Sequence, residues 1–329
     1  MEAKLKVLVT GGSGFIGSHT IDILLENGYT VSNFDIKTPW KSAHNNLWFQ
    51  GDIVNLEDIY RAINEFEPNY IIHLAAHAEI YSNRWDDFAS IHRGTENLLH
   101  AIDDYGRLER LLNVSTQLVI EPGYEPRSLL DYRPYTIYGE AKSYAESLLL
   151  QWRSSVHWVT VRPTNIWGPG HPSFSRAIWR YLHNRFYLHP MTKLPVFRTY
   201  GFVENTSAQI IKLLETDPAE TYRQVFYAGD GVIDSSIWVD LFSRALTNKP
   251  AHRVPVPILR SMGALGDITA RAGFRIPIDS GRVMRMTQSY AVPLERTLLL
   301  TGMPEIGIIQ GVEKSVKWLI EEEKFKIPS

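Results

Sequence analysis

The sequence contains no cysteine, carries little net charge and has no long apolar run. Without cysteine there is no disulfide bond, no thiolate-bound zinc and no cysteine nucleophile. A net charge of −2, with no run of Lys and Arg, makes nucleic acid and an anionic membrane poor partners. No segment approaches the ~18 apolar residues of a membrane span, and the first apolar run is too short for a signal peptide. We therefore expect a cytoplasmic protein.

The 329 residues allow two domains, or one large α/β domain with a smaller part attached. In the first half, short apolar runs alternate with amphipathic stretches of helical period. This alternation predicts a doubly wound parallel sheet, the Rossmann arrangement, because a helix is the usual crossover between parallel strands. The expected strands are 6–10, 29–34, 47–49, 70–75, 110–115 and 158–162. The expected helices in this half include 18–26, 56–66, 95–103 and 138–152.

A glycine-rich segment, GGSGFIG, follows the first expected strand and precedes a helical pattern. Gly11, Gly14 and Gly17 permit a tight turn and close approach of backbone N–H groups to a pyrophosphate at a helix N-terminus. Asp35, at the end of the next strand, can accept hydrogen bonds from a ribose hydroxyl and would repel a 2′-phosphate. Lys37 lies close enough to soften that repulsion. The pattern predicts NAD binding, and the alternative is a glycine turn that only closes a βα unit.

Asp52, in the segment GDI, follows the third expected strand. Its carboxylate could accept a hydrogen bond from an adenine amino group, with the backbone of Ile53 beside it. An aspartate in this place is equally typical of a turn or a helix N-cap. The residues alone leave the two interpretations open.

The second half is less regular and contains a Pro-, Gly- and Ser-rich stretch after Arg162. A helix at 207–215 and a strand at 225–227 are expected to return to the sheet. We expect residues 1–165 to form the NAD-binding domain, with returning elements at about 203–248. Residues 166–202 and 249–329 are expected to form a smaller substrate-binding cap.

Tyr138 and Lys142 lie one helical turn apart, downstream of Thr116 at the end of an expected strand. A phenol has a pKa near 10, so it needs a neighbouring cation to act as a base at neutral pH, and Lys142 could supply it. A Tyr-x-x-x-Lys spacing is common by chance, and its value here comes from its place in a dinucleotide-binding sheet. His73 and His77 share no helical face, because His73 lies in an expected strand, so no metal site is expected.

Several segments occur in an order that resembles the extended short-chain dehydrogenases/reductases, the family of NAD-dependent nucleotide-sugar epimerases and dehydratases. They are TGGSGFIG, Asp35, GDI, HLAA (73–76), GTENLL (94–99), VST and YGEAK. The segments RPTNIWGPG (162–170), RTYGFV (198–203) and 301–319 continue the likeness, so it covers nearly the whole chain. The motifs are specific for the family and much less specific for the substrate.

The resemblance implies roles for individual residues. Tyr138 would be the acid/base, Lys142 its partner, and Thr116 the hydroxyl that binds the same substrate oxygen. The implied cofactor-binding residues are Gly11, Gly14, Phe15, Ile16, Gly17, Asp35, Asp52, Ile53, Leu74, Ala75, Ala76, Lys142 and Pro163.

The resemblance and the position of the residues also indicate substrate contacts. Asn165 and Arg198 match positions that commonly contact the diphosphate of a nucleotide sugar. His77 and Gln117 lie where a substrate could touch them, although a turn role suits His77 and its neighbour Glu79 equally well. Arg282 and Arg285 are candidates for a second diphosphate arginine, and solvated surface charges are the alternative for both.

The departures from the family pattern restrict the chemistry. Dehydratases of the family carry an Asp-Glu pair after the active-site threonine, whereas this chain has Gln117 and Leu118, which do not exchange protons. The epimerase-reductases that make fucose-type sugars have a cysteine at the position of Gln117, and this chain has none. Hydride chemistry at a single carbinol needs neither group.

We therefore predict an NAD-dependent epimerase that acts at a carbinol, C4 above all, of a nucleotide-linked sugar through a transient keto intermediate. One alternative is a dehydrogenase/reductase of a nucleotide sugar or of a hydroxysteroid-like alcohol, because 254–273 is apolar as in hydroxysteroid-type members of the superfamily. A remote alternative is a non-catalytic NAD-binding regulator. The resemblance also implies a homodimer that packs through about 95–105 and 138–152.

Overall fold

The structure is a computed structural model that describes residues 4–78, 80, 82–128, 130–172, 174, 177–271, 273 and 277–327. The chain clusters into two units. The first comprises Met1–Ile166, Val203–Asp230 and Pro293–Glu305, and the second comprises Trp167–Phe202, Gly231–Val292 and Ile306–Ser329. None of the helices in these described ranges is long and apolar enough to span a bilayer.

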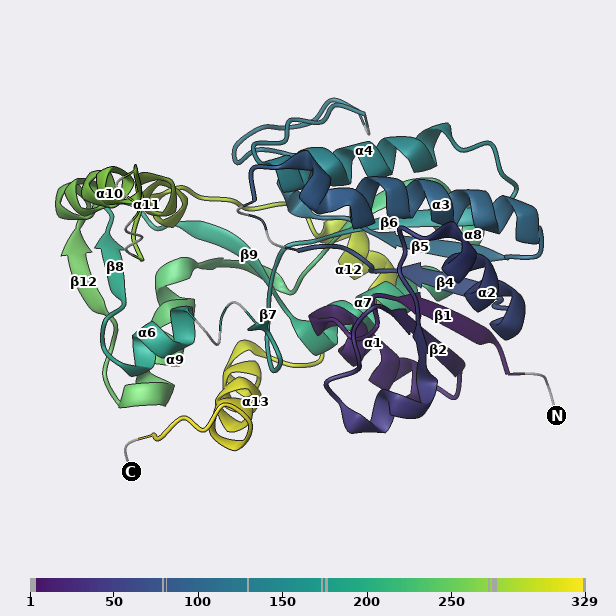
Figure 1. Ribbon diagram of the computed structural model, residues 1–329. Coiled ribbons are helices and arrows are strands. Elements are labelled where there is room, and N and C mark those ends of the chain that lie inside the picture. Colours follow the sequence, from purple (N-terminus) through teal and green to yellow (C-terminus); the bar gives the residue numbers. More distant parts are fainter. Residues whose placement is uncertain are drawn as a thin grey trace. The chain divides into compact units, whose positions relative to one another are not determined.

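The first unit is built on a seven-stranded sheet with the order β10-β6-β5-β4-β1-β2-β3 (Figure 1). All of its strand pairs are parallel, which confirms the predicted doubly wound sheet. The strands are β1 (Lys6–Thr10), β2 (Thr30–Asp35), β3 (Trp48–Gln50), β4 (Tyr70–His73), β5 (Arg110–Val114), β6 (His157–Pro163) and β10 (Gln224–Ala228).

Helices cover both faces of this sheet, which is why its central strands are apolar on both sides. One face carries α1 (Phe15–Glu26), α7 (Val203–Glu215) and α12 (Glu295–Thr301), and the other carries α2 (Leu56–Phe66), α3 (Ala89–Tyr105) and α4 (Ile137–Gln151) (Figure 1). The remaining helices of the unit are short: η1 (Ser42–Leu47), η2 (Trp85–Phe88), η3 (Gln117–Val119) and α8 (Pro218–Thr221).

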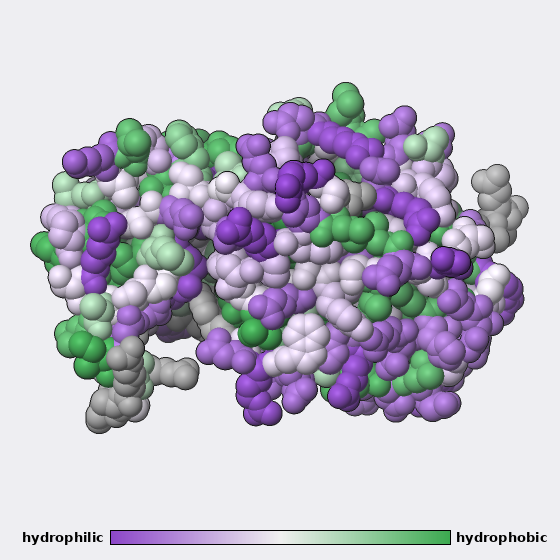
Figure 2. Space-filling model, turned by 90° about the horizontal axis from the view of Figure 1, so that it is seen from above, coloured by the Kyte–Doolittle hydropathy of each residue, from purple (hydrophilic) through white to green (hydrophobic). Residues whose placement is uncertain are grey.

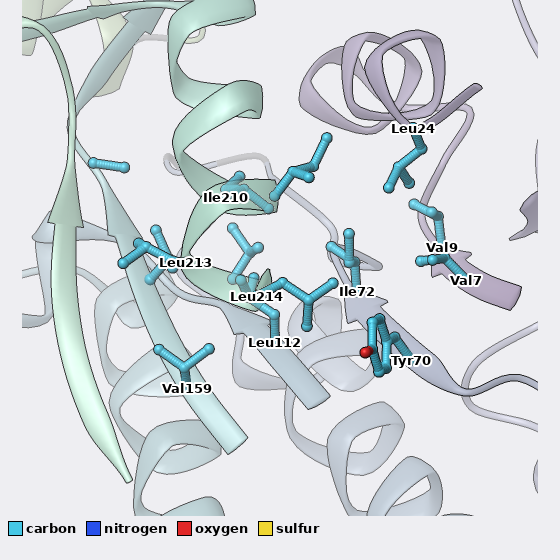
Figure 3. Packing of buried hydrophobic residues seen from close by; sticks show 14 of the residues in the cluster. Val7, Val9, Leu24, Tyr70, Ile72, Leu112, Val159, Ile210, Leu213 and Leu214 are labelled. Carbon is cyan, nitrogen blue, oxygen red and sulfur yellow. The ribbon is translucent and has the colours of Figure 1, made fainter. Parts of the chain in front are cut away.

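The two cores of the first unit follow the alternation of side chains along each strand. On β1, Val7 and Val9 pack with Leu24 and Ile210 on one face, whereas Leu8 points to the other. Figure 3 shows the first of these clusters, with Ile72 and Leu112 of neighbouring strands beneath α7. The sheet is thus held between two buried apolar layers, and its carboxyl edge is left to the loops that form the candidate site.

The second unit contains two small sheets. In one, β12 (His252–Pro255) pairs in parallel with β8 (Leu188–Met191). The other has the order β11-β9-β7, with β11 (Gly231–Asp234) antiparallel to β9 (Phe197–Phe202) and with β7 (Asn165–Trp167) at its edge. The helices among its described residues are α6 (Ile178–His183), α9 (Ser235–Thr247), α10 (Val256–Arg271), α11 (Ser280–Thr287) and α13 (Ile308–Glu321).

The core of the second unit is largely aromatic. Trp167 packs edge-on against Phe202, Trp238 and Phe242, with ring centroids 5.1–6.0 Å apart. A side chain at Gly311 of α13 would come within 2.7 Å of the Trp167 ring, so this helix must present a glycine there. Trp167 is therefore a core residue of this unit.

The structural units differ in extent from the domains expected from the sequence. The returning segment was expected to reach about 248, but 231–248 cluster with the second unit, because β11 pairs with β9 and α9 packs beside α6 and α13. Residues 293–305, expected in the cap, cluster with the first unit, where α12 packs on α7. Both differences arise from contacts between segments far apart in the chain.

Candidate functional site

The glycine-rich turn follows β1 directly and depends on glycine at two positions. Gly11 has a φ of +75°, and a side chain there would come within 2.6 Å of the Ala75 backbone nitrogen. A side chain at Gly17 would overlap the carbonyl oxygen of Gly11 and lie 2.7 Å from the Cα atom of Gly12. The chain thus turns sharply from β1 into α1, and the start of the helix lies against the end of the strand.

The N-terminus of α1 has the features of an anion-binding site. Gly14 is the N-cap, no side chain caps the helix, and its first turn contains no acidic residue. Phe15 and Ile16 are the first two helical residues. Their N–H groups and the helix dipole favour negative charge at this end. This arrangement fits a pyrophosphate.

Asp35 ends β2 beside the same turn. One carboxylate oxygen accepts a hydrogen bond from the Ser13 N–H at 3.0 Å and the other from the Lys37 N–H at 2.9 Å. Burial raises the pKa of Asp35, and these N–H groups act in the opposite direction. Because both oxygens are held, the carboxylate has a fixed orientation at the carboxyl edge of the sheet, as recognition of a ribose requires.

A groove of about 640 Å³ lies beside the edge strand β3 and the helix α2, and Ile36, Gly51 and Asp52 are among the residues that line it. Asp52 uses one carboxylate oxygen to accept a hydrogen bond from the Val54 N–H at 2.9 Å, as an aspartate that stabilises a turn does. The Ile53 side chain is buried against α3 at Gly94. Adenine binding by the Asp52 carboxylate and the Ile53 backbone stays a prediction.

The loop after β4 is hydrogen-bonded to the end of β1. The Leu74 N–H donates to the Thr10 carbonyl at 2.9 Å, and the Ala75 N–H donates to the Thr10 hydroxyl at 3.3 Å. Ala76 packs against the cluster that contains Tyr138. His77 is exposed, and its N–H donates to the Ser90 hydroxyl at 2.9 Å. Its neighbour Glu79 lies outside the described residues.

Thr116 and Tyr138 come together because α4 approaches η3 closely. A side chain at Gly139 would overlap the Leu118 carbonyl, so glycine allows this approach. Thr116 is the N-cap of η3, and its hydroxyl accepts a hydrogen bond from the Leu118 N–H at 3.3 Å. Burial raises the pKa of Tyr138 to about 12, and the interaction with the Thr116 side chain acts in the opposite direction.

Lys142 lies one turn further along α4 and is buried. Its Nζ atom donates a hydrogen bond to the Val114 carbonyl oxygen at 2.7 Å, at the carboxyl end of β5. Burial lowers the pKa of Lys142 to about 8, and the charge of Glu146 opposes this effect. Burial thus dominates the pKa of both Tyr138 and Lys142 in this structure.

The remaining predicted residues lie on several elements. Gln117 is buried in η3, next to Thr116. Pro163 ends β6, opposite Ala228 of β10, and Asn165 begins β7.

The arginines proposed for a diphosphate lie in the second unit. The Arg198 guanidinium of β9 donates to the carbonyl of Arg285 and, at 3.3 Å, to that of Gln288, at the end of α11. The Arg282 guanidinium donates to the Pro277 carbonyl. The Arg198 guanidinium is thus hydrogen-bonded to the backbone at the end of α11.

Sequence reasoning missed a buried ion pair that involves α4, the helix of Tyr138 and Lys142. Glu146 of α4 and Arg162 of β6 form two hydrogen bonds, of 2.9 and 2.6 Å, within the first unit. One signal was available: Glu146 follows Lys142 by one helical turn, just as Lys142 follows Tyr138, so the three share a helix face.

Together, these features define an α/β protein that binds a dinucleotide at the carboxyl edge of its sheet. The glycine turn, the uncapped helix N-terminus and the oriented Asp35 carboxylate fit NAD. The model of the NAD dependent epimerase/dehydratase family matches residues 7–225, and the chain belongs to this family. Both the family resemblance and the cofactor NAD are thereby confirmed.

Curated relatives match about half of the chain. The 3-beta-hydroxysteroid dehydrogenase of Mycolicibacterium neoaurum is 32% identical over 189 residues, which are 53% of this chain and 51% of that protein. The decarboxylating sterol-4-alpha-carboxylate 3-dehydrogenase of Mus musculus is 30% identical over 177 residues, 51% of this chain and 47% of that protein. The chain thus spans about half the length of the curated relatives it matches.

Solved structures match nearly all of the chain. The UDP-glucose 4-epimerase of Thermotoga maritima, crystallised with UDP-glucose, is similar with a TM-score of 0.74 and 21% identity, over 96% of this chain and 98% of that chain. The UDP-glucose 4-epimerase of Thermus thermophilus, in complex with NAD, gives a TM-score of 0.69 and 22% identity, over 97% and 100%. At this identity the similarity confirms the fold.

Proposed function

We propose that the protein catalyses NAD-dependent hydride transfer at a secondary carbinol. The first candidate is epimerisation at C4 of a nucleotide-linked sugar through a transient keto intermediate. The observation that carries the proposal is the buried Tyr138 phenol beside the Thr116 hydroxyl, with Lys142 one turn away, at the carboxyl edge of an NAD-binding sheet. Such a set holds and moves the proton of one carbinol oxygen.

The protein residues would act on that oxygen in turn. When bound, NAD accepts a hydride from the carbinol carbon and can return it. Thr116 would hold the substrate oxygen by a hydrogen bond, and Tyr138 would take its proton during oxidation. Because burial raises the pKa of Tyr138 to about 12, the phenol is protonated at neutral pH and is well prepared to donate to a keto oxygen. For the opposite step it needs positive charge, which Lys142 would supply.

The neighbour of Thr116 limits the chemistry that is possible after oxidation. An elimination next to the keto group needs a protein base that removes a proton from one substrate carbon and a protein acid that protonates the group leaving the adjacent carbon. The amide of Gln117 can do neither, because it exchanges no proton near neutral pH. Leu118, the next residue, is apolar. The proposal therefore restricts the chemistry to one carbinol, either as a redox-neutral inversion or as a net oxidation.

A second candidate is net oxidation of an apolar, sterol-like secondary alcohol. Arg198, which would contact a diphosphate in the first candidate, has its guanidinium hydrogen-bonded to the end of α11. Large apolar side chains are exposed on the neighbouring α10, at Ile258, Leu265 and Ile268. Figure 2 shows apolar side chains among the polar ones on the left of the visible face. The curated relatives at 30–32% identity, named for 3-hydroxysteroid and sterol dehydrogenation, also favour this candidate.

One set of assays separates the candidates. The purified protein is first analysed by mass spectrometry for co-purifying nucleotides. It is then offered UDP-, GDP-, CDP- and dTDP-sugars and a 3β-hydroxysteroid, with NMR of the products and absorbance at 340 nm.

C4 epimers formed without added cofactor would support the first candidate, and stoichiometric NADH from the steroid would support the second. A keto sugar with stoichiometric NADH would make the protein a nucleotide-sugar dehydrogenase. Bound NAD without any turnover would contradict the proposal and favour a regulator.

A further inference from the structure

Glu146 lies on the same face of α4 as Tyr138 and Lys142. The three residues follow one another at intervals of one helical turn, and all three are buried. Glu146 is the deepest, with 1% of its surface exposed. A carboxylate so far from water is retained only where a charge and hydrogen bonds compensate for lost hydration.

Arg162 of β6 supplies that compensation. Its Nε and Nη2 atoms donate to the two carboxylate oxygens of Glu146, at 2.9 and 2.6 Å, and Arg162 itself is 4% exposed. The rings of Tyr132 and Tyr227 each lie 5.7 Å from its guanidinium carbon, and Nη1 donates to the Tyr227 hydroxyl at 3.4 Å. A planar guanidinium that binds both oxygens and packs near two rings fixes the position of the carboxylate.

The surroundings of Lys142 make this carboxylate important. From β5, the Val114 carbonyl accepts a hydrogen bond from Nζ. From β4, His73 faces it with a pKa lowered to about 3 by burial, with a smaller contribution from the charge of Lys142, so that the imidazole is neutral. From its own helix come the neutral Tyr138 and the Glu146 carboxylate, which is paired with Arg162. Burial disfavours the charged form of Lys142, and the charge of Glu146 opposes that effect.

We propose that Glu146, held in place by Arg162, is a positioning residue that keeps the Lys142 amine charged and directed at the carboxyl end of β5. The inference rests on the proposed function, in which the charged Lys142 assists Tyr138. Glu146 itself would touch neither substrate nor cofactor. Its part is to supply negative charge from behind Lys142, so that burial does not neutralise the lysine at the pH where Tyr138 works.

The test is a direct titration of Lys142 that needs no substrate. The protein is labelled with ¹³C,¹⁵N-lysine, the side-chain signals are followed by NMR against pH, and the Lys142 signal is assigned from its loss in Lys142→Met. Glu146→Gln removes the carboxylate charge at constant volume. Because it leaves Arg162 unpaired and can disturb folding, Glu146→Gln/Arg162→Met removes both charges together. Glu140→Gln, the same change at an exposed position of α4, is the matched control.

We expect the titration midpoint of Lys142 to fall by about one pH unit or more in Glu146→Gln. It should fall by less in the double variant, because the loss of the Arg162 cation offsets part of the loss of the carboxylate charge. It should stay at the wild-type value in Glu140→Gln. Glu146→Asp, which keeps the charge, should recover part of the shift. An unchanged midpoint in every variant that lacks the Glu146 carboxylate and keeps the native circular dichroism and melting temperature would overturn the inference.

Activity provides the second readout once a substrate is known. The alkaline limb of the pH profile of kcat/KM should move to lower pH in the double variant by the same amount as the NMR midpoint. A shifted midpoint in a protein that turns over none of the substrates would leave this inference standing and contradict the proposed function. Normal turnover of the double variant, with an unchanged midpoint and pH profile, would contradict this inference and leave the proposed function standing.

Discussion

The Nζ atom of Lys142 lies 2.7 Å from the carbonyl oxygen of Val114, so the buried amine of α4 is hydrogen-bonded to the carboxyl end of β5. Thr116 follows on the same segment. One hydrogen bond thus ties the helix that carries Tyr138 and Lys142 to the strand that leads to Thr116. The site is therefore part of the packed sheet and helix, and its chemistry and its stability are coupled.

Lys142→Met should separate stability from activity. A pKa lowered from 10.5 to about 8 means that the folded state disfavours charged Lys142 by about 3 kcal/mol at pH 7, and the variant removes this cost. Loss of the hydrogen bond to Val114 destabilises the variant by about 1 kcal/mol. We expect the free energy of unfolding in urea to rise by about 1–2 kcal/mol and turnover to fall by about a hundredfold or more.

The pH dependence of Lys142→Met has a defined sign. Between pH 8 and 10.5 the unfolded wild-type chain binds a proton at Lys142 that the folded chain does not, so this residue makes stability rise with pH. The variant should lose that rise, and Lys249→Met, at an exposed lysine, should keep it. A variant that is less stable than wild type and has the same pH slope would contradict the assigned cause.

Tyr138→Phe should remove the proton donor and keep the cofactor. We expect turnover to fall about 10²- to 10⁴-fold, because the phenol is the proposed acid/base, while NAD still co-purifies in the same ratio. Tyr144→Phe is the control, because Tyr144 is exposed on the same helix and its hydroxyl bonds to Glu96. A near-normal rate in Tyr138→Phe would show that another group moves the proton.

Asp35→Asn should weaken the discrimination between NAD and NADP. The carboxylate charge repels a 2′-phosphate, while both its oxygens are held by the N–H groups of Ser13 and Lys37. We expect the Kd for NADP to fall about tenfold relative to that for NAD, measured by calorimetry. The exposed Glu26→Gln, on α1, controls for a general change of charge. An unchanged ratio would remove Asp35 from the cofactor-binding residues.

Gly17→Ala should disrupt the turn between β1 and α1. The new Cβ atom would overlap backbone atoms of Gly11 and Gly12, which cannot move without shifting the strand. We expect a loss of about 3 kcal/mol in the free energy of unfolding, together with loss of NAD binding. Gly307→Ala is the matched control, because φ is −71° there and a Cβ atom meets nothing within 4 Å. Equal stability of the two variants would contradict the steric explanation.

His73 should make the fold sensitive to acid. Its ring bonds to the hydroxyls of Thr10, at 2.7 Å, and Thr95, at 3.2 Å, and burial, more than the charge of Lys142, lowers its pKa to about 3. Below pH 6.5 the unfolded chain therefore binds a proton that the folded chain does not, and stability falls as pH decreases towards 3.

In His73→Gln, the difference in unfolding free energy between pH 7 and pH 4 should be smaller than in wild type by about 3 kcal/mol. The exposed His100→Gln should keep the wild-type difference, as measured by urea denaturation at both pH values. If the unfolding free energy of His73→Gln differed between pH 7 and pH 4 as much as that of wild type, the acid sensitivity would come from other groups.

The first half of the fold was predictable because its signals are local. The strand before Gly11, the glycines themselves and the helix after Gly14 need only neighbouring residues to be recognised, and the structure has them in this order. Element ends were less accurate: α1 begins at Phe15 where 18 was expected, and β4 ends at His73 where 75 was expected. The last hydrogen bonds of an element depend on its neighbours, which the local pattern does not contain.

The roles of the candidate site residues stay predictions, and the structure shows only which of these residues lie together. Thr116 and Tyr138 do come together, because Gly139 lets α4 approach η3. That Arg198 binds the backbone of α11 could not be inferred, since nothing in the local sequence specifies which carbonyls lie near a guanidinium. The helical spacing places Glu146 on the face of Tyr138 and Lys142, but no local pattern specifies Arg162 as its partner.

The sequence by itself determined the doubly wound sheet, the glycine turn and the NAD family, because these depend on periodicity and on steric demands between neighbouring residues. Only the tertiary structure decided the charge environment of Lys142 and the return of α12 to the first unit. These depend on burial and on contacts between residues distant in the chain. Burial changes a proton affinity by removing water, and no local pattern records how much water the folded chain removes.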